Sequence, residues 1–368
     1  MTPGKARLLA GIGCVGTLVV LAAVFLAFDI PHALFPAAIE GALREYCAIL
    51  TFVTALAALM LPFDFIGGIL IPAAYESRRH EFPLWLKQWS RSVSVLLLFF
   101  SITLFFYLQI GRAVGAPWLI VQFAVLQIGL VAGQELIWEA MAARLNDNSS
   151  NAITQFVQHS DPRFTGGITG LPGFESILVP SDWRTRLQPE WRNMLIRRRR
   201  AALKSGGRNR GIVVAMLWNI CSFTAAVVAS GAAMNSVADL VTVFLWFLLF
   251  SFVGLLLLPT LNRRAVFALD RHVAGKVNID EFREAIREVD QLTERDPKRS
   301  ASAESVFQPI PCPERRTQAL SQVGPSEGSA WNVARTALFL SWAFGGPLAR
   351  AVHCNVGRPE LWAMMPTD

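Results

Sequence analysis

The middle of the chain carries the sequence PEWRNMLIRRRRAALKS, which runs from Pro189 to Ser205. Pro189 suits the first position of a helix, and the following Gly206–Gly207 pair suits its end. Apolar residues recur here at steps of three and four, which predicts an amphipathic helix with Arg198 on its apolar face. The four arginines Arg197–Arg200 sweep about three quarters of the helix circumference, at roughly 100° each. They cannot all be solvated if the apolar stripe is buried.

The composition is that of a membrane protein. Of the 368 residues, 53% are hydrophobic, and the mean hydropathy is positive, which is more apolar than an ordinary soluble domain. The net charge of +7 indicates membrane topology and contact with anionic lipid headgroups, and we expect no nucleic-acid partner. The five cysteines are scattered without a C-x-x-C pair, so we expect neither a disulfide framework nor a zinc knuckle.

Six apolar segments are long enough to cross a bilayer, which takes about 20 residues each. They are Leu8–Phe28, Ala48–Ala73, Ser92–Ile110, Trp118–Trp138, Ile212–Ala233 and Val237–Thr260. The expected fold is therefore mainly α, a polytopic membrane helix bundle with about six spans.

Positive charges alternate between the connections. Lys5 and Arg7 precede the first span, and the connection Glu139–Arg210 holds twelve Lys and Arg against six Asp and Glu. The basic pair Arg263–Arg264 follows the sixth span. Basic segments stay on the cytoplasmic side, so we expect both termini and both large polar regions there.

The expected organisation has four parts: a four-span region at 1–138, a cytoplasmic insert at 139–210, a two-span hairpin at 211–260, and a cytoplasmic part at 261–368. The two cytoplasmic parts should form one small α-rich domain. Phe174–Pro180 reads as a short β-strand, placed at the edge of that domain. Ile279 begins an amphipathic helix that ends near Leu292, with a capping box at its start. Residues 337–349 are apolar but too short to span, so an interfacial or re-entrant segment is expected.

Two polar features remain open. Asp64 lies within the second predicted span, close to Gly67 and Gly68, where an acid serves either function or a structural hydrogen bond at a kink. His353 and Cys354 are adjacent in the tail. His353 and Cys354 are either two of the ligands of a metal site or residues of a packed tail.

Four short patterns follow one another between Phe164 and Leu320. They are V-P at Val179–Pro180, P-E at Pro189–Glu190, then RRAVFALDR after two spans, and QPIPCPERRTQAL. In this order they resemble the membrane zinc metallopeptidases of the HtpX and CAAX-prenyl-protease type. In that family, V-P and P-E precede a helix with H-E-x-x-H, and E-x-x-A-D and H-P-P-x-x-x-R-x-x-x-L follow two spans. The resemblance implies a bacterial inner (plasma) membrane protein.

At the positions that match the family's metal ligands, this chain has residues that cannot bind a metal. The H-E-x-x-H positions fall on Arg198, Arg199 and Ala202, and the glutamate ligand falls on Val266. Of the second motif, Asp270 is retained. Arginine has no lone pair to offer a metal, and alanine and valine have no ligand atom. We therefore expect no catalytic residue, no metal ligand and no cofactor at these vacated positions.

The expected function is that of a non-catalytic pseudopeptidase that binds a protein partner or a polypeptide. The alternatives are an active membrane metallopeptidase with other ligands, and a membrane transporter. At the vacated site we expect Arg198 to pair with Asp270, because a buried guanidinium needs an anion. The alternative there is that all four arginines face anionic lipid headgroups.

The alternation of basic segments predicts a topology that reporter fusions can test. Fusions after Ser205 and after Asp368 should both report the cytoplasm, and a fusion at Asn235, in the short turn after the fifth span, should report the opposite side. A signal from the opposite side after Ser205 or after Asp368 would contradict the model of six spans, and a seventh span through 337–349 would change only the reporter after Asp368.

Overall fold

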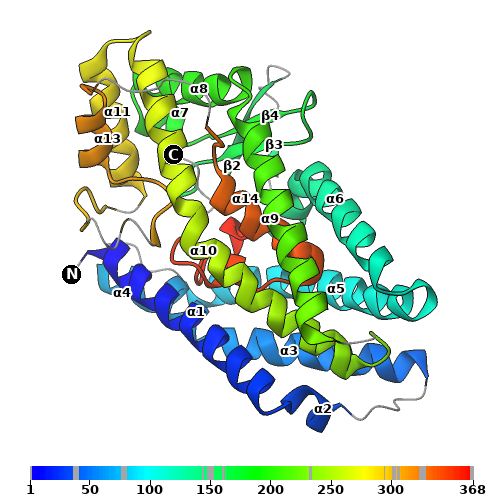
Figure 1. Cartoon of the computed structure of the whole chain (residues 1–368). Helices are drawn as coiled ribbons and strands as arrows, with labels where there is room; N and C mark the ends of the chain where they lie inside the picture. The colour runs from blue at the N-terminus through cyan, green and yellow to red at the C-terminus, as the bar shows by residue number, and fades with distance from the viewer. Residues whose placement is uncertain are drawn as a thin grey trace.

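The protein was analysed as a computed structural model. It describes residues 2–35, 41–75, 81–142, 145–146, 153–159, 161, 163–231, 234–293, 295–300, 304, 307–322 and 329–364. Six helical stretches in this part of the chain are long and apolar enough to cross a membrane, which confirms the six predicted spans (Figure 1). They are Pro3–Ala27, Ala42–Tyr75, Phe82–Val114, Ala116–Ala142, Gly207–Ser230 and Val237–Ala274.

The spans correspond to α1 (Pro3–Ala27), α3 (Ala42–Phe65) with its continuation, α5 (Phe82–Val114), α6 (Ala116–Ala142), α9 (Gly207–Ser230) and α10 (Val237–Ala274). Helix α10 starts at a capping box formed by Ser236 and Asp239. Its 38 residues extend over about 57 Å at 1.5 Å per residue, far more than the hydrocarbon core of a bilayer. Its last turns therefore leave the membrane and join the extramembrane domain.

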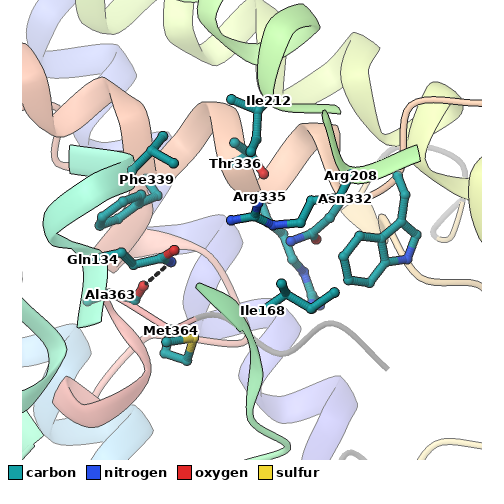
Figure 2. A pocket seen from close by; sticks show the side chains of 12 residues that line it. Gln134, Ile168, Arg208, Ile212, Asn332, Arg335, Thr336, Phe339, Ala363 and Met364 are labelled. Carbon is teal, nitrogen blue, oxygen red and sulfur yellow. Dashed lines mark hydrogen bonds between the residues drawn. The ribbon is translucent and has the colours of Figure 1, made fainter. Parts of the chain in front are cut away.

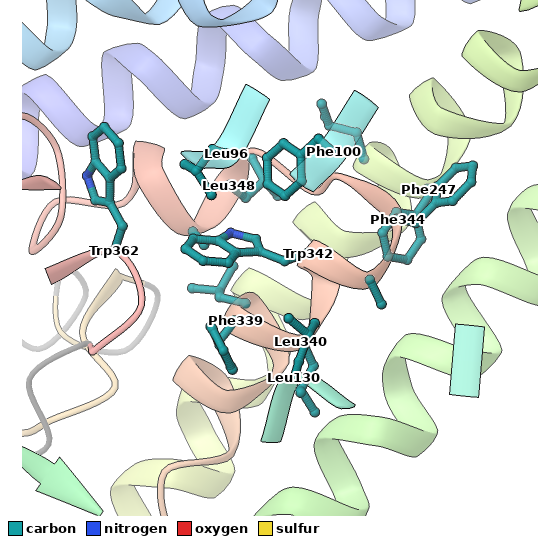
Figure 3. Close-up of a cluster of buried hydrophobic side chains, with 14 of the residues drawn as sticks. Leu96, Phe100, Leu130, Phe247, Phe339, Leu340, Trp342, Phe344, Leu348 and Trp362 are labelled. Atoms are coloured by element: carbon teal, nitrogen blue, oxygen red, sulfur yellow. The ribbon is translucent and has the colours of Figure 1, made fainter. Parts of the chain in front are cut away.

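The C-terminal segment fills the centre of the bundle. It forms α14 (Val333–Leu340), η2 (Ser341–Phe344), α15 (Leu348–Ala351) and η3 (Pro359–Leu361), and it is buried from Trp331 onward apart from half-buried Asn332 and Thr336. Figure 3 shows Trp342 and Phe344 among side chains of the surrounding spans. The ring of Phe344 lies 4.7 Å from that of Tyr107 in α5 and 4.8 Å from that of Phe223 in α9.

This location differs from an interfacial helix. We expected 337–349 to be interfacial or re-entrant, and the structure buries this segment between spans, so it does not lie on the surface of the bundle. Phe247, whose ring centroid lies 5.9 Å from that of Phe344, sits about 15 Å along α10 from its first residue. Residues around Phe344 therefore reach the middle of the bundle.

The extramembrane domain contains a small sheet with strand order β1-β2-β4-β3. Its strands are β1 (Leu145–Asn146), β2 (Thr154–Gln158), β3 (Gly167–Thr169) and β4 (Ser176–Pro180). The predicted strand is β4, but it is interior rather than at an edge, pairing in parallel with β2 and antiparallel with β3. The expectation of one strand missed its neighbours because β2 and β3 are too short to show a periodicity of two.

Five further helices are α2 (Ile30–Leu34), on the far side of the bundle, and α7 (Trp183–Arg186), α8 (Pro189–Lys204), α11 (Ile279–Leu292) and α13 (Pro313–Ala319) around the sheet. Only the last four belong to the extramembrane domain itself (Figure 1). Phe282 and Ile286 of α11 are buried against Met194 of α8 and Leu320. The amphipathic helix therefore packs its apolar face on this domain, and the expected fold class is confirmed.

Asp64 anchors the C-terminal segment to the second span. Its carboxylate accepts hydrogen bonds from Arg350 (2.5 Å), from the indole of Trp89 (2.9 Å) and from the backbone N–H of Gly357 (3.0 Å). The helix widens just after it into a π-helix, η1 (Ile66–Leu70), and continues as α4 (Ile71–Tyr75). We considered Asp64 either as a functional acid or as a partner in structural hydrogen bonds at a kink. The structure shows the structural hydrogen bonds.

The neighbouring glycines let two backbones touch. A Cβ on Gly67 would lie 2.2 Å from the carbonyl oxygen of Val356, and one on Gly68 would lie 2.4 Å from that of Gly357. Both contacts are shorter than any real Cβ contact, and the neighbours are backbone atoms that cannot rotate away. The C-terminal segment therefore docks on η1 at two positions that have no side chain.

The close approach predicts the effect of a single methyl group. Gly67→Ala should lower the stability by about 1–3 kcal/mol, as overpacking does, and it should lower the thermal midpoint in detergent. Gly129→Ala is the matched control, because a Cβ at that position meets nothing within 4 Å. It should be neutral or stabilising by up to about 1 kcal/mol. Equal midpoints for the two variants would contradict the docking.

Candidate functional site

Helix α8 separates its arginines into two groups. Arg198 and Arg199 are fully buried, together with Ala202, whereas Arg197 and Arg200 are exposed. The buried pair follows the apolar stripe of Met194 and Leu195, which packs toward α10 and α11, so the helix cannot turn either of these arginines to solvent. The alternative that all four arginines face lipid headgroups does not hold for this geometry.

Arg198 and Asp270 lie in direct contact, and a second arginine joins them. The Nε of Arg198 donates to Oδ1 of Asp270 at 2.6 Å. Arg316 of α13 donates from Nε to Oδ2 at 2.7 Å and from an Nη to Oδ1 at 3.1 Å. All three side chains are at most 4% exposed. We call Arg198, Asp270 and Arg316 the ion triad; it joins α8, α10 and α13.

The remaining vacated positions lie beside the ion triad. Ala202 is one helical turn from Arg198 and packs with Ala265 and Leu269 of α10. Val266 is one turn from Asp270 on the same helix and is fully buried. The positions that the resemblance assigns to metal ligands thus meet at one place, between α8 and α10.

The residues at this place do not fit a metal ion. Guanidinium groups carry only donors, and the methyl groups of alanine and valine have no lone pairs. Both oxygens of Asp270 are already held by guanidinium N–H groups. Within the described residues, no group of three or more His, Cys, Asp or Glu could hold a metal. His353 and Cys354 are buried in the tail, so their interpretation as half of a metal site gains no further ligand there.

Arg199 ties α8 to the sheet. Its two Nη atoms donate to the backbone carbonyl of Leu178 in β4, at 2.7 Å, and to that of Thr165. Its guanidinium also lies over the ring of Trp183, 5.3 Å from the centroid, where a cation is attracted by the aromatic face. Arg199, in the second vacated position, is therefore held by two backbone carbonyls and by the ring of Trp183.

Little space is left around the ion triad. A cavity lined by Arg316, Arg335 and His353 has a volume of about 40 Å³, room for about three waters at roughly 10–15 Å³ each. The cavity in Figure 2, next to Ile168 of β3, is equally small. There the amide of Gln134 donates to the carbonyl of Ala363 at 2.9 Å, so the tail itself closes this side.

A second buried cluster holds the tail under the sheet. Asp161 accepts from Arg163 at 3.0 Å and from Arg358 at 2.8 Å. Burial, and then the Asp161 carboxylate, raise the pKa of Glu360 well above its ordinary value, and a side-chain hydrogen bond links the two. Burial lowers the pKa of His159 to about 4, so this imidazole is neutral at pH 7. The cluster is compact, and its Asp161 carboxylate is paired with two guanidinium groups.

Sequence reasoning missed the third member of the ion triad. Arg316 stands four residues before Leu320, which matches the R-x-x-x-L end of the family's last motif, and that spacing could have pointed to it. Asp161, Arg350 and Arg358 carried no such signal, because isolated charges in loops are normally solvated. Their partners are far away in sequence, 197 residues for Asp161 and Arg358.

Comparison with known proteins gives the fold. No family profile and no curated protein matches this chain by sequence. The structure is similar to the crystal structure of S. mikatae Ste24p, with a TM-score of 0.65, 11% identity, and coverage of 81% of this chain and 82% of that chain. Ste24p is a membrane zinc metallopeptidase of the CAAX protease type. The chain therefore has a membrane-metallopeptidase-like fold.

The ion triad predicts a large effect of one substitution. Asp270→Ala leaves two buried guanidinium groups without their carboxylate and should destabilise the protein by about 3–5 kcal/mol. Asp280→Ala is the matched control, since Asp280 pairs with Arg283 at the surface and should cost less than about 1 kcal/mol. Thermal melts in detergent measure both. A melt of Asp270→Ala that overlays the parent would refute the structural role of the triad.

Proposed function

We propose that this protein is a non-catalytic relative of the membrane zinc metallopeptidases, HtpX-like in its cytoplasmic motifs, that acts by binding a protein partner or a polypeptide. It would reside in the inner membrane of a bacterium, with the sheet and α8 on the cytoplasmic side. The observation that carries the proposal is the ion triad. It occupies the place where α8 and α10 would present metal ligands, and it closes that place with one carboxylate held between two guanidinium groups.

The chemistry of the triad supports a role without catalysis. A peptidase of this class needs a metal with an open position and a base that can take a proton from water. Arg198 and Arg199 cannot accept a proton at neutral pH, because a guanidinium stays protonated. Asp270 is the one carboxylate here, and its oxygens point at Arg198 and Arg316 rather than into a space where water could be activated.

The packing around the triad supports the same proposal. An extended peptide needs a groove, whereas the cavity beside Arg316 has a volume of about 40 Å³. Residues of the C-terminal segment, among them Arg335 and His353, line it. A substrate would have to displace this segment before any of its peptide bonds could approach Asp270.

The retained scaffold supports binding as the remaining activity. Removing the catalytic groups leaves the spans, the sheet and α8 in place, and the cytoplasmic surface stays available to other chains. Ste24p acts on polypeptides as a CAAX protease, and we propose that this chain has kept recognition of a polypeptide without cleavage. The surface of the extramembrane domain would carry that recognition.

Metal content and cleavage test the proposal together. The purified full-length protein should contain far less than one zinc per chain after dialysis against zinc, and it should not cleave casein. The combined variant Arg198→His, Arg199→Glu, Ala202→His and Val266→Glu places the family's H-E-x-x-H motif in α8 and its glutamate ligand in α10. This variant should bind zinc if the assigned positions are right. Asp270 loses Arg198 as a partner in it but keeps Arg316, so the carboxylate stays paired.

Zinc in the parent at one equivalent, or cleavage of casein that a chelator abolishes, would reject the proposal and favour an active metallopeptidase with other ligands. The single variant Arg199→Glu is the control for the combined variant. It introduces one carboxylate without the histidines and should not retain zinc.

A further inference from the structure

A wide basic groove runs along the outer side of α8 and α10. Its lining includes Arg197, Arg200 and Lys204 of α8, Arg210 of α9, and Lys276 just after α10, with His272 between them. The two helices pack side by side at the top of Figure 1, where α10 has left the bundle. The groove has a volume of about 750 Å³, within the range of about 300–1,000 Å³ that small-molecule sites occupy.

The cations gather on one face because of helical spacing. Arg197, Arg200 and Lys204 are three and four residues apart, so they form one stripe of α8, adjacent to the stripe that buries Arg198. On the opposite wall, His272 and Lys276 are four residues apart and form a second stripe. The four successive arginines thus have two roles. The buried Arg198 and Arg199 connect α8 to other elements, and the exposed Arg197 and Arg200 line the groove.

No carboxylate compensates these charges within the groove. Five of its described lining residues are Lys or Arg, and none is Asp or Glu. Arg197 and Lys204 have neither a hydrogen-bond nor an ion-pair partner among the described residues. The other cations are held in place by neutral groups: Arg200 by the hydroxyl of Thr154 at 3.2 Å, and Arg210 by the carbonyl of Ser205 at 2.7 Å.

The imidazole of His272 adds to this arrangement. Its Nε2 lies 2.9 Å from the Nζ of Lys276, and the ammonium of Lys276 has two further N–H groups for other partners. Five positive charges placed close together repel one another and cost stability unless an anion joins them. A surface that served only solubility would intersperse acids among these cations.

We propose that this basic groove is a binding site for a phosphate-bearing ligand, whose phosphate oxygens accept hydrogen bonds from Arg197, Arg200, Lys204, Arg210 and Lys276. Phosphate fits because its oxygens take several charge-assisted hydrogen bonds at once, and arginine forks match them in pairs. The volume exceeds that of one inorganic phosphate, so the ligand carries two phosphates or a phosphate attached to a larger group. The site is separate from the ion triad, and its test is independent of the proposed function.

Two sources share this chemistry, a lipid headgroup and a soluble phosphate compound. Arg210 belongs to the first turn of α9, directly before its apolar stretch, and therefore lies near headgroup level. Lys276 lies beyond the end of α10, about 15 residues and roughly 22 Å past the last apolar stretch. The near end of the groove favours a lipid phosphate, and the far end is open to the cytoplasm, so the experiment has an arm for each source.

The experiment uses full-length protein in nanodiscs and one double variant, Arg197→Gln with Lys204→Gln. Both side chains are exposed and have no partner to lose, so the fold should persist. In nanodiscs of phosphatidylcholine, pyrophosphate is titrated at constant ionic strength with chloride as the reference, and the thermal midpoint and calorimetric binding are measured. In the second arm, the midpoint is compared between nanodiscs with and without phosphatidylglycerol. Lys87→Gln is the control, an exposed cation on α5 outside the groove.

For a soluble ligand, pyrophosphate should bind at one site and raise the thermal midpoint of the parent and of Lys87→Gln. The double variant should bind it about 10-fold or more weakly, the loss expected for charge-assisted hydrogen bonds. For a lipid ligand, phosphatidylglycerol should raise the midpoint of the parent and the control but not of the double variant. Either pattern supports the site and identifies its source. No response to either probe, or an equal response in the double variant, overturns it.

Discussion

A guanidinium taken out of water needs an oxygen from the protein, and this requirement governs the whole structure. Leaving one such charge unpaired costs several kcal/mol, so each buried arginine fixes the position of whatever segment supplies its partner. Within the described residues, three buried carboxylates that pair with buried arginines illustrate this. Asp270 gathers α8, α10 and α13; Asp64 holds the second span to the C-terminal segment; Asp161 joins the sheet to the tail. Together they connect parts of the chain that share no hairpin or turn.

Apolar packing provides the stability, and the ion pairs provide the arrangement. The interior of the bundle is built from aromatic and branched side chains that would pack almost as well in several registers, because burial of apolar surface is not directional. A bidentate contact such as that of Arg316 with Asp270 tolerates only one register. This division explains how the fold keeps α8 and α10 opposed in one register. Helix α10 buries Asp270 on one face, and with His272 on another face it forms one wall of the basic groove.

Sequence alone predicted the elements whose signal is local. The spans follow from apolar runs, and the helix with Phe282 and Ile286 follows from its period of 3.6. The pairing of Arg198 with Asp270 rested on a resemblance in motif order, and the structure brings the two residues into contact. What could not be predicted depends on distant partners. Residues 337–349 are as apolar as a surface segment in lipid, and hydropathy does not distinguish lipid from protein as a neighbour. The edge strand β3 is hidden in a glycine-rich stretch that reads as a turn.

The burial of the C-terminal segment has a consequence for how the protein is made. Asp64 enters the bilayer with its span, whereas Arg350 follows 286 residues later. At a synthesis rate of about 5–20 residues per second, the acid waits roughly 15–60 s for its partner. During that interval residues 333–364, which are buried between the spans in the finished protein, have not all been made. The core of the bundle can therefore be completed only after the whole C-terminal segment has been synthesised.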